Sequence, residues 1–335
     1  MKTYDLYAIG NALVDAEYEV TDSHLQTMGV DKRHMTLIDD VRKAELLGHV
    51  DKLHARRSGG GSAGNTVVAL AQLGGKAFYS CRVADDELGH FYKQDLLNNG
   101  VDTNLSHAPL HAGQTGSCMV MVTPDAERSM STFLGATADL DHTALHAQDI
   151  ARAKVYYMEG YLAASPSGLQ AALQGRQMAK DAGVALATTL SDVSMINFCR
   201  PGLDAIVGQD LDYLFCNEEE AQVWCGSQDF AVICQQMSQL AQTVCLTRGP
   251  LGCVVLNGAQ HTAVPAARVQ ALDTNGAGDM FAGAFLYAVT QGHSHAESAW
   301  LANQAAAQVV SQYGNRLTLA DMGALKTRFG AFVAA

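Results

Sequence analysis

Basic residues are scarce in this sequence, and those present are scattered. The chain of 335 residues has 22 Lys and Arg against 34 Asp and Glu, which gives a formal net charge of −12. The densest basic spot is the short pair Arg56 and Arg57. Because binding to a phosphate backbone or to an anionic membrane needs clustered positive charge, we expect neither nucleic acid nor a membrane as a partner.

Cysteine pairs and long apolar runs are also lacking. The 8 Cys are spread along the chain without a C-x-x-C pair, which argues against a zinc ribbon or a thioredoxin-type redox site. Cys245 and Cys253 stand in apolar runs and are expected as small core residues. The sequence shows no signal-peptide pattern and no apolar run of the roughly 20 residues that a membrane span requires. These features predict a cytoplasmic location.

Proline, at 6 residues, and charged residues, at 17%, are too few to suggest a disordered linker, whereas 48% of the chain is hydrophobic. We therefore predict one domain spanning 1–335. Short apolar runs alternate with helical patterns, which is typical of β-α-β units in an α/β fold with a mostly parallel sheet. The predicted strands are 6–10, 77–83, 155–158, 184–188, 213–216, 243–247 and 253–256, and the predicted helices include 65–73, 87–99, 168–182 and 218–225.

Two regions interrupt this alternation. Residues 16–20 and 35–38 read as strands without an intervening helix. Residues 115–123 and 128–134 flank a polar turn and are expected to form a hairpin. We expect these regions, about 15–55 and 108–136, to form a small β-sheet lid inserted in the main domain.

Residues 273–279 (Asp-Thr-Asn-Gly-Ala-Gly-Asp) precede an apolar helical run. The small residues Gly276, Ala277 and Gly278 allow backbone N–H groups to converge on an anion at the helix N-terminus. Asp279 would then lie beside that anion, where a carboxylate can take the proton of an attacking hydroxyl. The alternative is a plain glycine-rich turn with Asp279 stabilising the helix end.

A second glycine-rich stretch, residues 57–65, fits two short motifs. Gly59, Gly61 and Gly64 match G-x-G-x-x-G of dinucleotide-binding proteins, and Ser62 matches the nucleophile of G-x-S-x-G hydrolases. Both motifs need a preceding strand, whereas the residues before this stretch are polar and basic. A flexible turn into the helix at 65–73 is a further alternative.

The two glycine-rich stretches resemble the sequence signatures of the ribokinase-like (PfkB) family of carbohydrate and nucleoside kinases. The resemblance spans nearly the whole chain. Residues 10–15, 128–130 and 156–161, together with Asn275, are similar to the adenosine kinase-like branch. The fold that the resemblance implies is a three-layer αβα fold with a small β-sheet lid.

The resemblance also implies roles for individual residues. It makes Asp279 the catalytic base and the amides of Gly276, Ala277 and Gly278 an anion hole. It places Asp15, Gly60, Gly61, Asn65 and Arg128 at the substrate, Thr247, Gly249, Asn275 and Asn303 at ATP, and Asn217 and Glu220 at Mg²⁺, mostly indirectly. Several of these residues could instead have a purely structural role. Asp15 could be a turn residue, Glu220 could complement the helix dipole, and Arg128 and Asn303 could lie at the surface.

The function implied is an ATP- and Mg²⁺-dependent kinase that phosphorylates a primary hydroxymethyl group of a ribose-containing acceptor, with adenosine or a related purine nucleoside as first choice. A ribokinase- or fructokinase-like sugar kinase is the alternative. A catalytically dead regulatory protein with the same fold is the least favoured hypothesis. A monovalent cation such as K⁺ is a candidate activator. The expected partner is a small-molecule acceptor, and the expected state is a monomer or a homodimer.

Overall fold

The large sheet forms the centre of the molecule. The structure is a computed structural model that describes residues 2–32, 35–51, 53, 56–125 and 127–334. Within these residues the large sheet has the strand order β14-β13-β12-β11-β10-β9-β1-β5-β6, parallel from β6 to β12 and antiparallel beyond. Its strands are β1 (Tyr4–Ile9), β5 (Ala77–Ser80), β6 (Val101–Thr103), β9 (Ala153–Met158), β10 (Ala185–Thr189), β11 (Leu211–Asn217), β12 (Ala241–Thr247), β13 (Cys253–Asn257) and β14 (Gln260–Val264).

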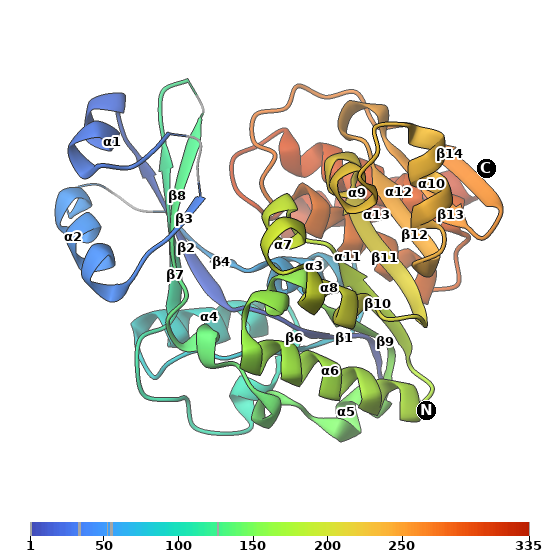
Figure 1. Ribbon diagram of the computed structural model, residues 1–335, viewed down its shortest axis with the longest axis horizontal. Coiled ribbons are helices and arrows are strands. Elements are labelled where there is room, and N and C mark those ends of the chain that lie inside the picture. Colours follow the sequence, from blue (N-terminus) through green and yellow to red (C-terminus); the bar gives the residue numbers. More distant parts are fainter. Residues whose placement is uncertain (1, 33–34, 52, 54–55, 126, 335) are drawn as a thin grey trace.

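Helices cover both faces of this sheet, so the main body has the predicted three layers (Figure 1). The helix α11 is buried along most of its length because its sequence is apolar almost throughout. One face carries α3 (Ser62–Gln72), α4 (Glu87–Asn98), α11 (Ala277–Thr290), α12 (His295–Val310) and α13 (Leu319–Val333). The other carries α5 (Ala147–Ala151), α6 (Pro166–Asp181), α7 (Val193–Phe198), α8 (Arg200–Val207), α9 (Glu218–Cys225) and α10 (Phe230–Met237).

A small second sheet lies beside the main body (Figure 1). Its order is β3-β8-β7-β2-β4. The side away from the large sheet carries two helices that pack on alternate residues of the strands, such as Met119 and Met121. The elements are β2 (Leu13–Glu19), α1 (Asp22–Met28), β3 (Met35–Leu37), α2 (Asp40–Val50), β4 (Arg56–Gly60), β7 (Gly116–Val122) and β8 (Arg128–Phe133).

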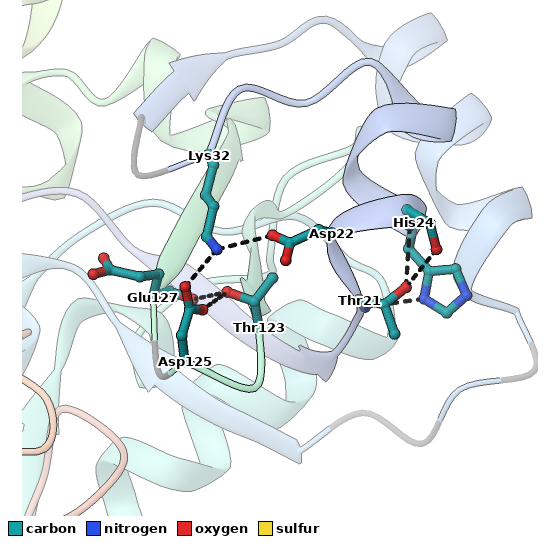
Figure 2. A network of polar contacts seen from close by, with 8 residues as sticks. Thr21, Asp22, His24, Lys32, Thr123, Asp125 and Glu127 are labelled. Carbon is teal, nitrogen blue, oxygen red and sulfur yellow. Dashed lines mark hydrogen bonds and ion pairs between the residues drawn. The ribbon is translucent and has the colours of Figure 1, made fainter.

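The hairpin of β7 and β8 confirms its prediction, but the predicted absence of a helix between the strands at 16–20 and 35–38 is wrong. The helix α1 begins at a capping box, in which Thr21 and His24 bond each other's backbone N–H groups, and it ends at Gly29 in the left-handed conformation. Lys32 then donates to Asp22 and to Asp125 in the hairpin turn, at 2.8 and 2.6 Å (Figure 2). These polar contacts hold a helix whose sequence has little apolar content.

The strand β4 is a second correction. It runs from Arg56 into the first glycines of the glycine-rich stretch, where the polar and basic sequence predicts no strand. It is an edge strand that pairs antiparallel with β2 in the small sheet, so its residues need no continuous apolar run. Its location outside the parallel sheet still differs from the strand that both a dinucleotide fingerprint and a hydrolase nucleophile turn require.

All eight cysteines are free thiols, and Cys245 and Cys253 are buried in the core as predicted. None of the helices in the described ranges combines the length and the apolar character needed to cross a membrane.

Candidate active site

A cavity of about 610 Å³ lies between the two sheets. Its floor is formed at the carboxyl ends of large-sheet strands, where Thr189, Asn217 and Thr247 line it. Ligands of open α/β sheets bind at this edge. The opposite wall comes from the small sheet and is mostly apolar: Leu13, Met35, Leu37, Cys118, Val120 and Met130.

Asp279 lies in the first turn of α11 and faces this cavity. Its Oδ1 accepts a hydrogen bond from Ser62 Oγ at 2.6 Å, and its Oδ2 accepts one from Asn65 Nδ2 at 3.0 Å. Burial raises the pKa of Asp279 to about 6, although the two hydrogen bonds and Arg316 act in the opposite direction. The carboxylate is therefore held in one orientation and is ionised above that pH.

The N-terminus of α11 is open to the cavity. No side chain caps it within the described part of the chain, and Gly276, Ala277 and Gly278 all line the cavity. Gly276 has a φ of 75°, and a Cβ there would come within 2.8 Å of Asn315. A Cβ on Gly278 would meet no atom within 4 Å. Free N–H groups and the helix dipole make this end suited to an anion.

The three successive glycines before α3 each make room for a different group of the site. A Cβ on Gly59 would overlap the Asp95 carboxylate, and one on Gly60 would lie 2.5 Å from the Asp15 carboxylate. Gly61 has a φ of 85°, and its Cβ would overlap the carbonyl oxygen of Asn11. The resemblance implies that Gly60 admits the substrate to the backbone, but the space beside it holds Asp15. Of the three, Gly61 lines the cavity.

Asp15 lies within β2 of the small sheet, not in a turn. Its Oδ2 accepts a hydrogen bond from Asn315 Nδ2 at 2.9 Å, and the residue lines the cavity. Burial raises the pKa of Asp15 to about 7, while Arg316 and Arg128 lower it and Asp279 raises it further.

Asn65 lines the cavity too, but most of its amide is already engaged. Its Oδ1 accepts from Arg316 Nε at 2.9 Å, and its Nδ2 donates to Asp279. One N–H of the amide is left for the substrate contact that the resemblance implies.

Asn217 and Glu220 line the cavity at the start of α9. They form a capping box in which Glu220 accepts from the Asn217 side chain at 2.7 Å and from its backbone N–H at 3.1 Å. Burial raises the pKa of Glu220 to about 7, and Asp192 and Asp279 raise it further. No group of three or more His, Cys, Asp or Glu in the described residues is arranged to hold a metal ion directly. The carboxylates of Glu220 and Asp192, which both line the cavity, fit a hydrated divalent cation, because such an ion keeps several waters and few protein ligands.

Comparison with known proteins places this site in a family. Residues 30–321 match the sequence pattern of pfkB family carbohydrate kinases, which is well over half of the chain. The chain belongs to the pfkB family of carbohydrate kinases. It is therefore a phosphotransferase that acts on a sugar or a nucleoside, and the family implies ATP as the phosphoryl donor.

The relatives of this pfkB kinase are named either as adenosine kinases or as sugar kinases. The chain is similar to the solved structure of adenosine kinase from Sinorhizobium meliloti, with 35% identity, a TM-score of 0.83 and 99% of each chain covered. It is equally identical, at 35%, to a probable sugar kinase from Rhizobium etli CFN 42, with a TM-score of 0.88 and 98% and 100% of the two chains covered. Adenosine kinase of Schizophyllum commune is 27% identical over 94% of this chain and 97% of its own.

Besides Gly60, three more of the predicted residues, Gly249, Asn303 and Arg128, lie outside the cavity lining. Gly249 follows β12 in a short turn. Asn303 is buried, and its Nδ2 donates to the carbonyl oxygens of Val264 at 2.9 Å and Pro265 at 3.2 Å. Arg128 forms an ion pair with Asp273 at 2.8 Å. In this arrangement Asn303 supports the end of β14, and Arg128 joins the small sheet to the loop before α11.

Sequence reasoning missed four polar residues at the site. Asn315 and Arg316 bond Asp15 and Asn65, as described above. Glu159 is fully buried, lines the cavity, and accepts from the backbone N–H groups of Asn11 and Ala63. Asp192 lines the cavity near Glu220. Glu159 could have been found, because it follows the predicted strand at 155–158 directly, but no local pattern marks Asn315 or Arg316.

Proposed function

We propose that this pfkB kinase transfers the γ-phosphoryl group of ATP to the 5′ hydroxyl of adenosine or a related purine ribonucleoside, with Asp279 as the base. The observation that carries the proposal is the placement of Asp279 at the open N-terminus of α11. A proton acceptor and an anion site are thus adjacent, as transfer of a phosphoryl group to a hydroxyl requires.

The residues around Asp279 support its role as a base. Ser62 and Asn65 occupy one position on each carboxylate oxygen, and an ionised carboxylate has lone pairs for further bonds. The acceptor hydroxyl would donate to one of these carboxylate oxygens and lose its proton to it. The hydroxyl oxygen would attack the γ-phosphorus atom as the bond between that atom and the ADP oxygen breaks. The N–H groups of residues 276–278 would then stabilise the negative charge on the transferred group.

Asn217, Glu220 and the neighbouring Asp192 are the residues that would hold Mg²⁺, mostly through water. When bound, the ion neutralises charge on the phosphates. Thr247 and Asn275 line the same cavity and are proposed to contact the nucleotide. Activation by a monovalent cation such as K⁺ stays a prediction.

The shape of the cavity favours a nucleoside over a free sugar. Asp15 and the remaining N–H of Asn65 offer polar partners for ribose hydroxyls at one side. The small sheet presents an apolar wall, in which Met35 and Leu37 are 44% and 60% exposed. A planar purine can cover such a wall, whereas a free sugar carries hydroxyl groups around its ring and would leave the wall in water. Tyr161 also lines the cavity and is proposed to stack on the base.

An ADP-release assay with different acceptors tests this proposal. We expect kcat/KM for adenosine to exceed that for inosine, ribose and fructose. The value for 2′-deoxyadenosine should be lower than that for adenosine by roughly 10²-fold or more, because a buried Asp15 would face a missing hydroxyl. If a free sugar has a higher kcat/KM than every nucleoside, the nucleoside assignment is wrong and the protein is a sugar kinase. The name of the Rhizobium etli relative favours this alternative. If none of the nucleosides or sugars leads to ADP release, the result would favour a catalytically dead protein.

A further inference from the structure

A row of partly or fully buried polar side chains leads from α4 to Asp279. Asp95, in α4, forms an ion pair with Arg316, which lies in the loop between α12 and α13. Arg316 Nε donates to Asn65 Oδ1 at 2.9 Å, and Asn65 Nδ2 donates to Asp279 Oδ2 at 3.0 Å. Four separate elements of the chain thus meet in one connected series of contacts.

The chemistry of Arg316 fixes the direction of these contacts. A guanidinium group only donates hydrogen bonds, so the atom of Asn65 that faces it must be the amide oxygen. The amide NH₂ then points toward Asp279, which as a carboxylate only accepts. Without Arg316 the Asn65 amide could turn over and present its oxygen to the Asp279 carboxylate, which would repel it.

Burial of this guanidinium costs free energy of folding, because the charge loses contact with water. The Arg316 side chain is 10% exposed, and its Nη2 atom is buried without a hydrogen-bond partner in the described part of the chain. A Cβ on Gly59 would lie 2.9 Å from Arg316 Nη1. A buried cation with an unsatisfied donor is weak support for stability, even when it is paired. A local role in the site accounts for it better.

Arg316 supplies positive charge to a site in which most of the ionisable groups around Asp279 are acidic. Carboxylates face it from several elements, namely Asp15 in β2, Glu159 after β9 and Glu220 in α9, and each of their pKa values is raised by Asp279. The phenols of Tyr157 and Tyr161 are affected in the same way. Arg316 is the cation that lowers the pKa of Asp279, and it also acts on Asp15 and Tyr92. Arg128 faces Asp15 from β8.

We infer that Arg316 is a positioning residue for Asp279: through the Asn65 amide it fixes the orientation of the carboxylate, and its charge favours the ionised form. This inference rests on the proposed function, because it assigns Arg316 a part in the reaction only if Asp279 is the base. Asp95 holds the guanidinium in place and partly neutralises it.

Two substitutions should change the pH profile in opposite directions. Arg316→Met removes a positive charge, so the pKa of Asp279 rises and the acidic limb of kcat/KM moves to higher pH. Asp95→Asn leaves Arg316 without its neutralising partner, so the pKa of Asp279 falls and the same limb moves to lower pH. An opposite charge at short range typically changes a pKa by on the order of one unit, which is the size of shift we expect for Arg316→Met.

The experiment measures kcat and KM for adenosine and ATP from pH 5 to pH 9. Arg316→Met should also lower kcat roughly 10–100-fold with little change in KM for ATP, because the substitution misplaces the base; KM for adenosine should rise, because the Asn65 amide loses the contact that orients it. Arg316→Lys should keep the wild-type limb, since it keeps the charge, while recovering only part of kcat. Arg328→Met is the matched control, because Arg328 lies on α13 and bonds Gln308 at an exposed position.

A merely structural role for Arg316 would lower activity in parallel at every pH and leave the limb where it is, which would overturn the inference. If Arg316→Met does not fold, Asp95→Asn and Arg316→Lys decide, since both retain a cation: an unchanged limb in Asp95→Asn contradicts the inference. These results are distinct from failure of the proposed function, in which the wild-type protein itself would phosphorylate none of the acceptors.

Discussion

At the scale of single residues, the glycines at 59–61 show how a site is built by leaving side chains out. Each position holds a group that a methyl would displace: the Asp95–Arg316 pair, the Asp15 carboxylate and the Asn11 carbonyl. The left-handed φ of Gly61 adds a backbone reason. Gly60 has no such backbone requirement, so the effect of an alanine there would be purely steric.

Gly60→Ala should therefore weaken the acceptor site without unfolding the protein. Its Cβ would push the Asp15 carboxylate out of place, and we expect kcat/KM for the acceptor to fall by about 10-fold or more. Gly323→Ala in α13 is the matched control, because a Cβ there meets nothing within 4 Å. The control should keep kcat/KM and raise the free energy of unfolding by about 0.5–1 kcal/mol. Wild-type kcat/KM in Gly60→Ala would show that the Asp15 position does not matter.

What the sequence could reveal about the site depended on whether a residue belongs to a contiguous pattern. Asp279 and Gly276–Gly278 stand in one motif, and the structure brings them together at the cavity. The contact between Arg316 and Asn65 joins positions 251 residues apart, so no local spacing could predict it. The resemblance assigned Asn65 to the substrate, but only the folded chain shows that most of its amide is used within the protein.

At the scale of elements, the sequence predicts four strands of the small sheet, β2, β3, β7 and β8, but misses β4 and the helices. The hairpin of β7 and β8 has the alternating pattern of a strand pair. The helix α1 has only two buried side chains, and its ends are defined by the Thr21 capping box and Gly29. The strand β4 consists of polar residues and glycines because it lies at an edge. Capping and edge pairing are weaker signals than apolar periodicity, so these elements were missed.

The small sheet is also the element expected to move. Its inner face lines the cavity with residues that stay partly exposed, such as Met35 and Leu37. A bound acceptor would cover them, so hydrogen exchange in the hairpin Gly116–Phe133 should slow when adenosine binds. Strands β9 and β10 of the large sheet serve as the internal control and should exchange equally slowly in both states. Equal protection of the hairpin with and without saturating adenosine would mean that the small sheet does not close.

At the scale of the whole molecule, the site exists only where the two sheets meet. The alternation of strands and helices is a local signal, and it predicted the three-layer fold that the structure confirms. How the small sheet faces the carboxyl edge of the large one is a long-range property. It joins Asp15 to Asn315 across 300 positions and gives the cavity one polar and one apolar side. The sequence therefore predicted the parts of this kinase better than their arrangement.

The role of Asp279 as the base is tested by the rate of adenosine 5′-phosphorylation by the wild-type protein and by Asp279→Asn. The pKa of Asp279 is raised to about 6, so the carboxylate is ionised at pH 8 and the wild-type rate should be lost as the pH falls through that value. The substitution keeps the size of the side chain but removes the base. It should lower kcat by about 10²–10⁴-fold at pH 8 while ATP binding, followed by calorimetry, is retained. Near-normal turnover by Asp279→Asn would contradict the account.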